Sequence, residues 1–271
     1  MSDAPLLFLA DPWRRFRAAT PARINLGRSG DALPTSAQLH FQADHARARD
    51  AVHGSVDFAA LTQTLAPHPT ILVKSQAVDR SIYLRRPDLG RRLSEDCASA
   101  LIKGAWDIVF VVADGLSAQA VSNHAIPTLK ACMARLQGWK IAPVFLAEQA
   151  RVALGDEIGD RLGADMVAVL VGERPGLSVA DSLGLYLTWA PRAGLKDSSR
   201  NCISNIHDAG LSADQAAVKF AWLAGQARIR RLTGVDLKEN AEGAVIPPVE
   251  TPISPSLSSP YSEEGSPDDT R

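Results

Sequence analysis

From Trp106 onward, apolar runs alternate with helical segments, and this alternation constrains the fold more than any other feature. The expected strands are Asp107–Val112, Ile141–Leu146, Val167–Val171 and Leu183–Trp189. The expected helices are Ala118–Gln137, Glu148–Leu162 and Ala213–Leu232, with Pro127 at a kink or an internal start. Runs that are apolar on both faces are typical of parallel strands covered by helices on each side. We therefore predict an α/β fold with a Rossmann-like, mostly parallel sheet.

Before Trp106 the sequence carries helix signals but no strong strand. Thr35 or Ser36 can cap a helix that runs from Ala37 past Ala51, and a second helical stretch contains Asp79–Leu84 and ends before Pro87. From Val245 onward, Pro, Ser and acidic residues dominate, which predicts disorder. We divide the chain into an extension (1–19), a helical region (20–100), a Rossmann-like domain (101–240) and a disordered tail (241–271).

The extension has two open interpretations. One is an amphipathic segment that docks on a partner or acts as an address, although Pro12 would interrupt a continuous helix. The other is a partly disordered terminus. The amphipathic interpretation rests on Leu6, Leu7, Leu9, Trp13 and Phe16 beside Arg14, Arg15 and Arg17.

Charge and cysteine content exclude several kinds of partner. The 29 basic and 30 acidic residues give a formal charge of −1, so we expect no nucleic acid and no anionic membrane as partner. The arginines Arg85, Arg86, Arg91 and Arg92 are interspersed with acids (Asp79, Asp88, Glu95 and Asp96), which favours a solvated face or a protein interface. Cys97, Cys132 and Cys202 are far apart without a CxxC pair, which fits a reducing setting. No apolar run approaches the roughly 20 residues of a membrane helix.

The stretch Asp165–Gly210 has the character of a ligand surface. Glu173 and Arg174 follow one expected strand, and the small polar cluster Asn201–Asn205 surrounds Cys202 after the next. In an open α/β sheet the ligand binds outside the carboxyl ends of the strands. From the residues alone, Glu173 in a surface turn with Arg174 is equally plausible, and a buried structural thiol is favoured for Cys202.

Common catalytic motifs are missing from the sequence. It contains no GxGxxG, GxxxxGK[ST], GxSxG or HExxH. Asp114 and Ser117, at a strand end, suit a helix cap at least as well as catalysis. One cluster has metal-ligand residue types, but its mixed charge is more typical of a solvated helix: His40, Asp44, His45, Asp50 and His53. We therefore assign no catalytic residue and no metal ligand.

Six segments resemble the small subunit of ethanolamine ammonia-lyase, in order and over about Thr20–Leu237. They are TPARINLGRSGDALPT (20–35), DHARARDAVH (44–53), VDRSIYLRRPDLGRRL (78–93), VADGLSA (112–118), VGERPGL (171–177) and NCISNI (201–206). Several of these segments are long and unusual, so the resemblance is specific. The two terminal segments lie outside it.

The resemblance implies an adenosylcobalamin-dependent lyase that converts ethanolamine to acetaldehyde and ammonia. The large subunit, a TIM-type barrel, would hold the substrate, and this chain would close the cobalamin site with its Rossmann-like domain. Cofactor-contacting positions of the family carry over to Val152, Glu173 and Cys202. A bacterial microcompartment, or otherwise the cytoplasm, is the location implied.

The sequence also bears on the mode of cobalamin binding and on two alternative functions. A DxHxxG loop would mark a histidine that replaces the nucleotide base on cobalt, but Asp50–Gly54 has the wrong spacing, so we expect a base-on cofactor. A self-sufficient Rossmann-type enzyme is a second hypothesis, and it lacks the expected glycine loop or titratable pair. A non-catalytic assembly protein using Arg85–Arg92 as its surface is the third.

Overall fold

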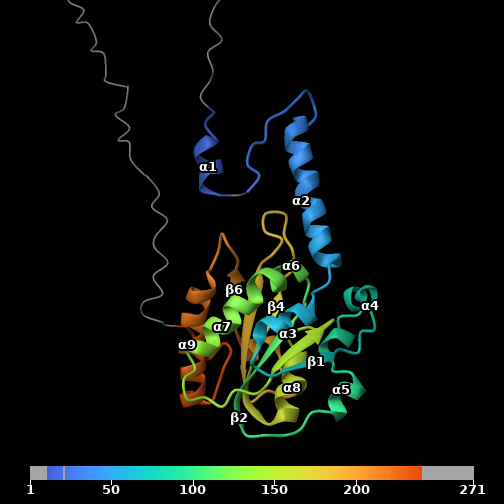
Figure 1. The fold of residues 1–271 in the computed structure, drawn as a ribbon. Coiled ribbons are helices and arrows are strands. Elements are labelled where there is room, and N and C mark those ends of the chain that lie inside the picture. Colours follow the sequence, from blue (N-terminus) through green and yellow to red (C-terminus); the bar gives the residue numbers. More distant parts are fainter. Residues whose placement is uncertain (1–10, 21, 240–271) are drawn as a thin grey trace, which may run out of the picture.

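A computed structural model describes residues 11–20 and 22–239 (Figure 1). Its strands form one six-stranded sheet in the order β1-β3-β2-β4-β5-β6. They are β1 Thr70–Lys74, β2 Trp106–Ala113, β3 Val144–Glu148, β4 Ala164–Gly172, β5 Leu183–Trp189 and β6 Arg200–Ile206. Because β1, β3, β2 and β4 are parallel neighbours, the predicted α/β class with a mostly parallel sheet is confirmed.

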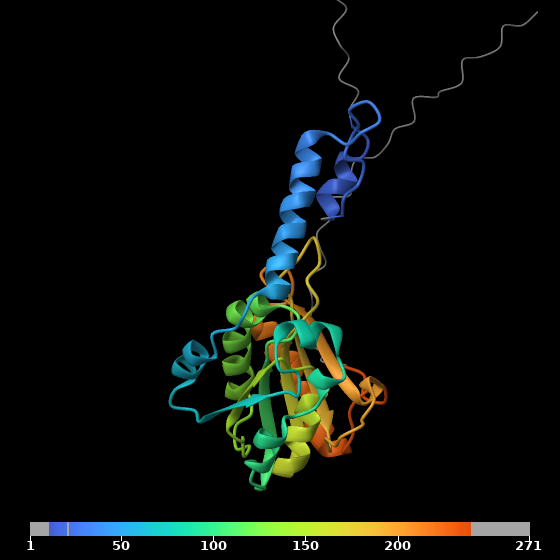
Figure 2. The same ribbon diagram turned by 90° about the vertical axis from the view of Figure 1, so that its right-hand side faces the viewer.

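Helices cover both faces of the sheet (Figures 1 and 2). Their bounds are α1 Arg14–Ala19, α2 Thr35–His53, α3 Phe58–Leu65, α4 Arg80–Arg85, α5 Glu95–Ser99, α6 Ala118–Ala120, α7 Ile126–Ala134, α8 Leu154–Leu162 and α9 Ala213–Arg230. A π-helical turn, Val121–Ala125, joins α6 to α7, and Pro127 lies in the first turn of α7. The expected internal start at Pro127 is therefore confirmed.

Three expectations about strands are wrong. The strand Leu183–Trp189 runs antiparallel to β4, because the short connection from β4 leaves no room for the crossover that a parallel pair requires. The segment around Cys202, expected as a loop, is the edge strand β6, antiparallel to β5. Residues before Trp106 do contribute a strand, since β1 pairs with β3. The division into domains stays a prediction.

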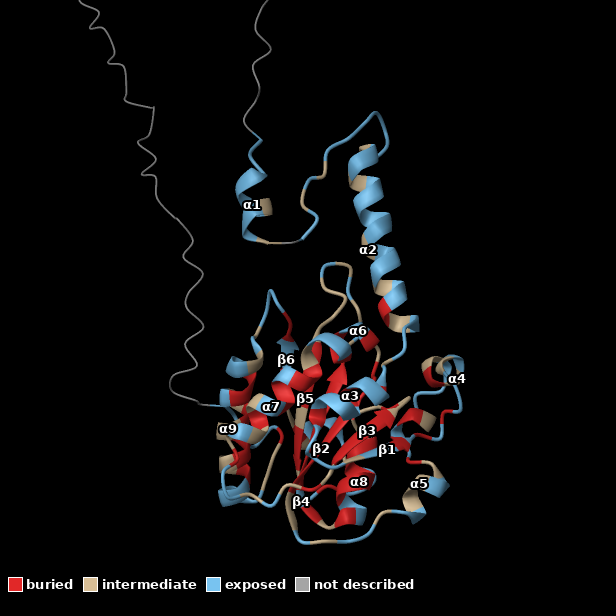
Figure 3. Ribbon diagram, viewed as in Figure 1, coloured by how far each residue is buried: buried red, intermediate tan, exposed pale blue. Residues whose placement is uncertain are grey.

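The core lies in two layers, one on each face of the sheet. Along β2, Ile108 and Phe110 point to the layer under α3, α7 and α9, while Val109 and Val111 point to the layer under α8. Phe220 of α9 packs against Phe110, with ring centroids 5.6 Å apart. Figure 3 shows these buried residues concentrated in the sheet and the inner faces of its helices.

The N-terminal helix α2 extends beyond the end of the sheet, with α1 beside it in both views (Figures 1 and 2). Ala51, near its C-terminal end, is the one buried residue of this helix. Asp44 pairs with Arg23 and Arg47 across its surface. Residues 1–10, including Leu6, Leu7 and Leu9, and the tail from residue 240 lie outside the described residues.

Candidate functional site

Three loops meet where the parallel strands β2, β3 and β4 end. Ala113 of β2 is in register with Ala147 of β3 and with Val171 of β4, so the carboxyl ends of these strands are level. The loops that follow therefore share one edge of the sheet, which is where open α/β sheets bind ligands. Glu173 follows β4 directly, and Val152 lies in the loop between β3 and α8.

Asp114 holds two of these loops together. Its carboxylate accepts hydrogen bonds from the backbone N–H groups of Gln149, at 2.9 Å, and Ala150, at 3.0 Å. The guanidinium of Arg80 lies 3.6 Å away. Burial raises the pKa of Asp114, and these bonds oppose that shift. Gln149 has a positive φ of 53°, so the chain turns here and α8 begins only at Leu154, later than expected.

The two cap candidates from the sequence have different roles. Ser117 does cap α6, because its hydroxyl accepts a hydrogen bond from the backbone N–H of Ala120 at 3.1 Å. The same hydroxyl donates to the carbonyl of Ala180 at 2.8 Å. Asp114 instead binds the turn after β3. Both side chains are buried and engaged in structural hydrogen bonds, so neither is available for acid-base chemistry.

A hollow of about 450 Å³ opens between these loops. Val152 and Glu173 both line it, so the structure brings together two of the three residues that the resemblance selected. Tyr83 from α4 and Tyr186 from β5 contribute aromatic walls, and Arg151 and Arg174 contribute guanidinium groups. We refer to it below as the strand-end hollow.

Cys202 lies beside this hollow rather than in a loop. It is directly opposite Tyr186 in the antiparallel β5–β6 ladder, so the two side chains share a face of the sheet. The residue is exposed, and the alternative of a buried structural thiol is therefore wrong. Desolvation by its neighbours raises the pKa of Cys202, while a hydrogen bond with Tyr186 partly offsets the effect. At neutral pH the group is a thiol.

Glu173 is oriented by its own strand end. Its carboxylate accepts a hydrogen bond from the hydroxyl of Ser182 at 2.6 Å, and its backbone N–H donates to the carbonyl of Ser182 at 2.9 Å. Gly184 leaves the space for it, because a Cβ there would lie 2.8 Å from Oε1 of Glu173. Within the described part of the chain, Arg174 forms no ion pair with Glu173, which argues against the alternative of a simple charged turn.

Sequence reasoning missed the aromatic and arginine residues of the strand-end hollow. Tyr83 is fully buried, and the centre of its ring lies 4.9 Å from the guanidinium carbon of Arg80 and 4.5 Å from that of Arg151. Its hydroxyl donates to the carbonyl of Ala150 at 3.1 Å. The available signal was Tyr83 itself, the one aromatic residue in the charged segment Val78–Leu93.

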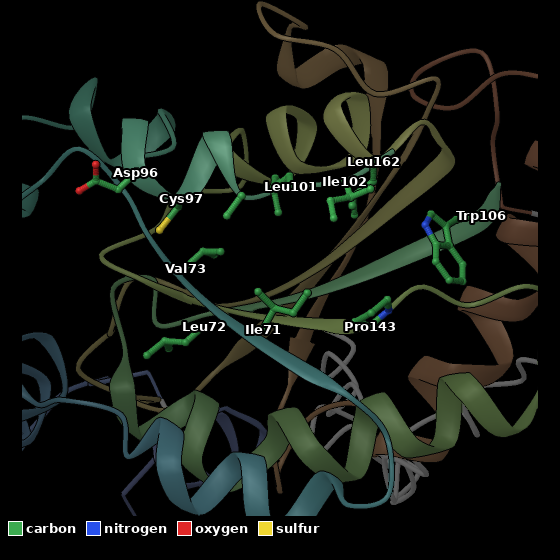
Figure 4. A pocket seen from close by; sticks show the side chains of 11 residues that line it. Ile71, Leu72, Val73, Asp96, Cys97, Leu101, Ile102, Trp106, Pro143 and Leu162 are labelled. Atoms are coloured by element: carbon green, nitrogen blue, oxygen red, sulfur yellow. The ribbon is translucent and has the colours of Figure 1, made fainter. Parts of the chain in front are cut away.

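A second hollow, of about 400 Å³, lies beside the edge strand β1. Figure 4 shows its walls of aliphatic side chains with Trp106 at one end and the carboxylate of Asp96 at the other. Apolar atoms dominate the lining, and none of Val152, Glu173 or Cys202 reaches it. The polar groups that would orient a ligand are gathered at the strand-end hollow instead.

The described residues contain neither a metal-ligand cluster nor a membrane-spanning helix. Within residues 11–20 and 22–239, no three His, Cys, Asp or Glu side chains come together as metal ligands would. In the histidine-rich helix α2, Asp44 is engaged by Arg23 and Arg47. None of the helices in this part of the chain has the length and apolar content needed to cross a membrane.

Fold and site together define an α/β chain with a mostly parallel sheet and a polar hollow at the ends of its parallel strands. The sequence model described as "Ethanolamine ammonia-lyase light chain (EutC)" matches residues 10–238. The chain therefore belongs to the ethanolamine ammonia-lyase light-chain (small-subunit) family, as the resemblance predicted.

Curated relatives agree with this assignment. An ethanolamine ammonia-lyase small subunit of Pseudomonas syringae pv. tomato is 51% identical over 258 residues, covering 89% of this chain and 90% of the relative. That of Azotobacter vinelandii is 53% identical over 244 residues, covering 86% and 90%. That of Ralstonia nicotianae is 53% identical over 250 residues, covering 89% and 93%. The similarity thus extends over nearly the whole length of each relative.

The cysteines provide a direct check of the site. Cys202 is exposed, whereas Cys132 is fully buried and its pKa is raised by burial to about 12. We expect a thiol reagent to label Cys202 in the folded chain and Cys132 only after unfolding. A small subunit implies a partner large subunit, and a partner that covers the hollow should slow labelling of Cys202. Mass spectrometry of labelled peptides measures both effects, with Cys202→Ser as the control; equal labelling with and without the partner would contradict the placement.

Proposed function

We propose that this chain is the small subunit of an adenosylcobalamin-dependent ethanolamine ammonia-lyase, which converts ethanolamine to acetaldehyde and ammonia. It would close the cobalamin site against the large subunit. The observation that carries the proposal is spatial. Val152 and Glu173, far apart in the sequence, line one hollow, and Cys202 flanks it beside Tyr186. The family assignment supports the reaction class.

The strand-end hollow suits part of a corrinoid. Cavities of about 300–1,000 Å³ enclose drug-sized ligands, and a corrinoid is larger, so a hollow of about 450 Å³ can hold only a portion of it. The remainder would lie against the large subunit. Glu173 can accept hydrogen bonds from the amide side chains of the corrin, and Val152 offers an apolar contact. Cys202, a neutral thiol, would form a weakly polar wall.

The chemistry of the reaction would come from the cofactor. Adenosylcobalamin, when bound, supplies radical chemistry, while the protein binds it, orients it and excludes water. Among the described residues that line the hollow there is no histidine, which supports a base-on cofactor. No side chain of the hollow is placed as a general acid or base, so we assign no catalytic residue to this chain.

The partner and the location follow from the same proposal. A small subunit requires a large one, so we propose a hetero-oligomer with the ethanolamine ammonia-lyase large subunit, without nucleic acid or membrane as partner. The family resemblance supports a bacterial microcompartment as the location, and the cytoplasm otherwise.

Reconstitution tests the proposal. The large subunit would be assayed for ethanolamine turnover alone, with this chain, and with Glu173→Ala. We expect turnover to depend on this chain. Because Glu173→Ala removes a charged acceptor, we expect the dissociation constant of cobalamin to rise about ten-fold or more. Glu95→Ala, which removes an exposed acid of α5, is the matched control and should behave as the wild type.

Cobalamin binding would be followed by absorbance, separately from turnover. A large subunit that turns over ethanolamine equally well alone would refute the proposed role. A Glu173→Ala complex with unchanged cobalamin affinity would remove Glu173 from the site.

A further inference from the structure

The charges around the strand-end hollow do not balance. Its lining contains one carboxylate, Glu173, and two guanidinium groups, Arg151 and Arg174. Within the described part of the chain, neither arginine lies within ion-pair distance of an acid. The lining therefore has an excess positive charge, and an anionic group would complete it.

Arg151 is held in place with most of its hydrogen-bonding capacity unused. Its guanidinium carbon lies 4.5 Å from the centre of the Tyr83 ring, and Nη2 donates one long bond, 3.4 Å, to the carbonyl of Tyr83. Nε is buried without a partner. A guanidinium has five N–H donors, and leaving a buried donor unsatisfied costs free energy. Stacking thus fixes the group, while the N–H donors of its two Nη atoms are used for only one long bond.

Hydrogen bonds hold both members of the stack, which makes Arg151 a preformed binding group. The Tyr83 hydroxyl is tied to the carbonyl of Ala150, and the backbone N–H of Arg151 donates to the carbonyl of Gly90 at 2.8 Å. Arg80, the other arginine at this ring, already donates to the carbonyls of Val52, at 2.7 Å, and Gly115, at 2.8 Å. Arg80 also lies 3.6 Å from the carboxylate of Asp114 and does not line the hollow, so Arg151 is the arginine of the stack that is placed to bind a ligand there.

We infer that Arg151, assisted by Arg174, binds the phosphodiester of the nucleotide loop of cobalamin. This inference rests on the proposed function. The side chains of the corrin ring are neutral amides, whereas the phosphodiester is an anion. Arginine recognises phosphate oxygens through paired N–H donors, and a partly buried guanidinium does so most effectively. The phosphodiester would then neutralise the excess positive charge of the hollow.

A comparison of two corrinoids distinguishes recognition of the phosphodiester from recognition of the corrin ring. Cyanocobalamin carries the nucleotide loop, whereas dicyanocobinamide lacks the phosphodiester and the base. Their binding to the complex of this chain with the large subunit would be measured by equilibrium dialysis. We expect the wild type to prefer cyanocobalamin, and Arg151→Met to lower that preference by about ten- to a hundred-fold. Arg151→Lys, which keeps the charge but not the fork of donors, should lie between the two.

Further variants guard against a loss of folding. Arg174→Met removes an exposed side chain, and it should also lower the preference, by a smaller factor. Arg161→Met removes an exposed arginine at the end of α8 and should leave the preference unchanged. Circular dichroism would verify that each variant is folded.

The outcomes distinguish this inference from the proposed function. Wild-type complex that binds neither corrinoid would refute the proposed function itself. Wild-type complex that prefers cyanocobalamin, with the preference unchanged in folded Arg151→Met, Arg151→Lys and Arg174→Met, would overturn only the inference. Binding of inorganic phosphate would be measured in parallel. If Arg151→Met weakened phosphate binding but not the corrinoid preference, the group would be a free-phosphate site, and the inference would be overturned as well.

Discussion

Replacing Arg200 with methionine is expected to lower the free energy of unfolding by about 3–5 kcal/mol. Arg200 begins β6, and its Nη1 donates to both carboxylate oxygens of Asp156 in α8, at 2.6 and 2.7 Å. The two side chains are only 2% and 1% exposed. Without the guanidinium, the Asp156 carboxylate would be buried and unpaired, which is among the most costly changes in a protein interior.

The loss should depend on pH in a defined direction. Burial raises the pKa of Asp156 even beside Arg200, and removing the cation should raise it further. A carboxyl with a raised pKa in the folded state favours folding at low pH, and this stability is lost as the pH rises through the folded pKa. The deficit of Arg200→Met should therefore be smaller near pH 4 than at pH 7. Urea denaturation followed by circular dichroism measures it.

Asp197 provides the matched control, because it contacts the same arginine from the surface. Its side chain is 91% exposed and lies 3.5 Å from Nε of Arg200. An exposed pair of this kind contributes about 0–1 kcal/mol, so Asp197→Ala should change stability little. Adding Asp156→Leu to Arg200→Met should recover part of the loss, because no unpaired charge remains. If Arg200→Met cost no more than Asp197→Ala, the buried pair would not be what holds β6 to α8.

The sequence was sufficient to predict the central strands of the sheet but not its edge strands. β2 and β4 are apolar on both faces, and continuous apolar runs of this kind can be recognised as strands from the sequence alone. β6 buries only every third residue and is rich in polar residues, so it lacks the alternation of a strand and resembled a loop around Cys202. β1 is short and mostly unburied, and its pairing with β3 depends on a contact distant in sequence. Edge strands have half the partners and correspondingly weaker patterns.

The residues of the site also divide into those that the sequence could predict and those that it could not. Glu173 was predictable because it follows an apolar strand, and the carboxyl end of a parallel strand is a common ligand position. Val152 came only from the family resemblance, since a valine before a helix carries no chemical signal. The stack of Arg80, Tyr83 and Arg151 could not be predicted, because α4 and the loop before α8 meet only in the folded chain. Whether such a group forms depends on tertiary contacts and not on a local sequence pattern.

Replacing Gly172 with alanine is expected to destabilise the chain by about 3 kcal/mol and to disturb the strand-end hollow. Gly172 ends β4 and lies against the turn after β2. A Cβ there would overlap the carbonyl oxygen of Ser117 and would lie 2.8 Å from that of Asp114. Both neighbours are backbone atoms and cannot rotate away. The carbonyl of Gly172 also accepts the N–H of Leu116 at 2.8 Å, so displacement of one strand end moves the other.

Two other glycines separate this steric effect from the general effect of adding a methyl group. A Cβ at Gly176, in the loop after β4, would lie 3.4 Å from its nearest neighbour, and one at Gly225, inside α9, would meet nothing within 4 Å. Gly176→Ala should be close to neutral, and Gly225→Ala should raise stability by about 0.5–1 kcal/mol, because alanine is the better helix former. Thermal denaturation of the three variants provides the comparison. Equal stability of Gly172→Ala and Gly176→Ala would show that the end of β4 does not approach the turn after β2 this closely.

Because Glu173 follows Gly172 directly, the same substitution also tests the site. In folded Gly172→Ala, displacement of the strand end should move Glu173 and weaken cobalamin binding by the complex with the large subunit. Gly225→Ala should bind cobalamin like the wild type, since α9 covers the sheet away from the hollow. If only Gly172→Ala weakened cobalamin binding, the affinity for cobalamin would depend on the close approach of the end of β4 to the turn after β2. Equal binding by both would place the cofactor elsewhere.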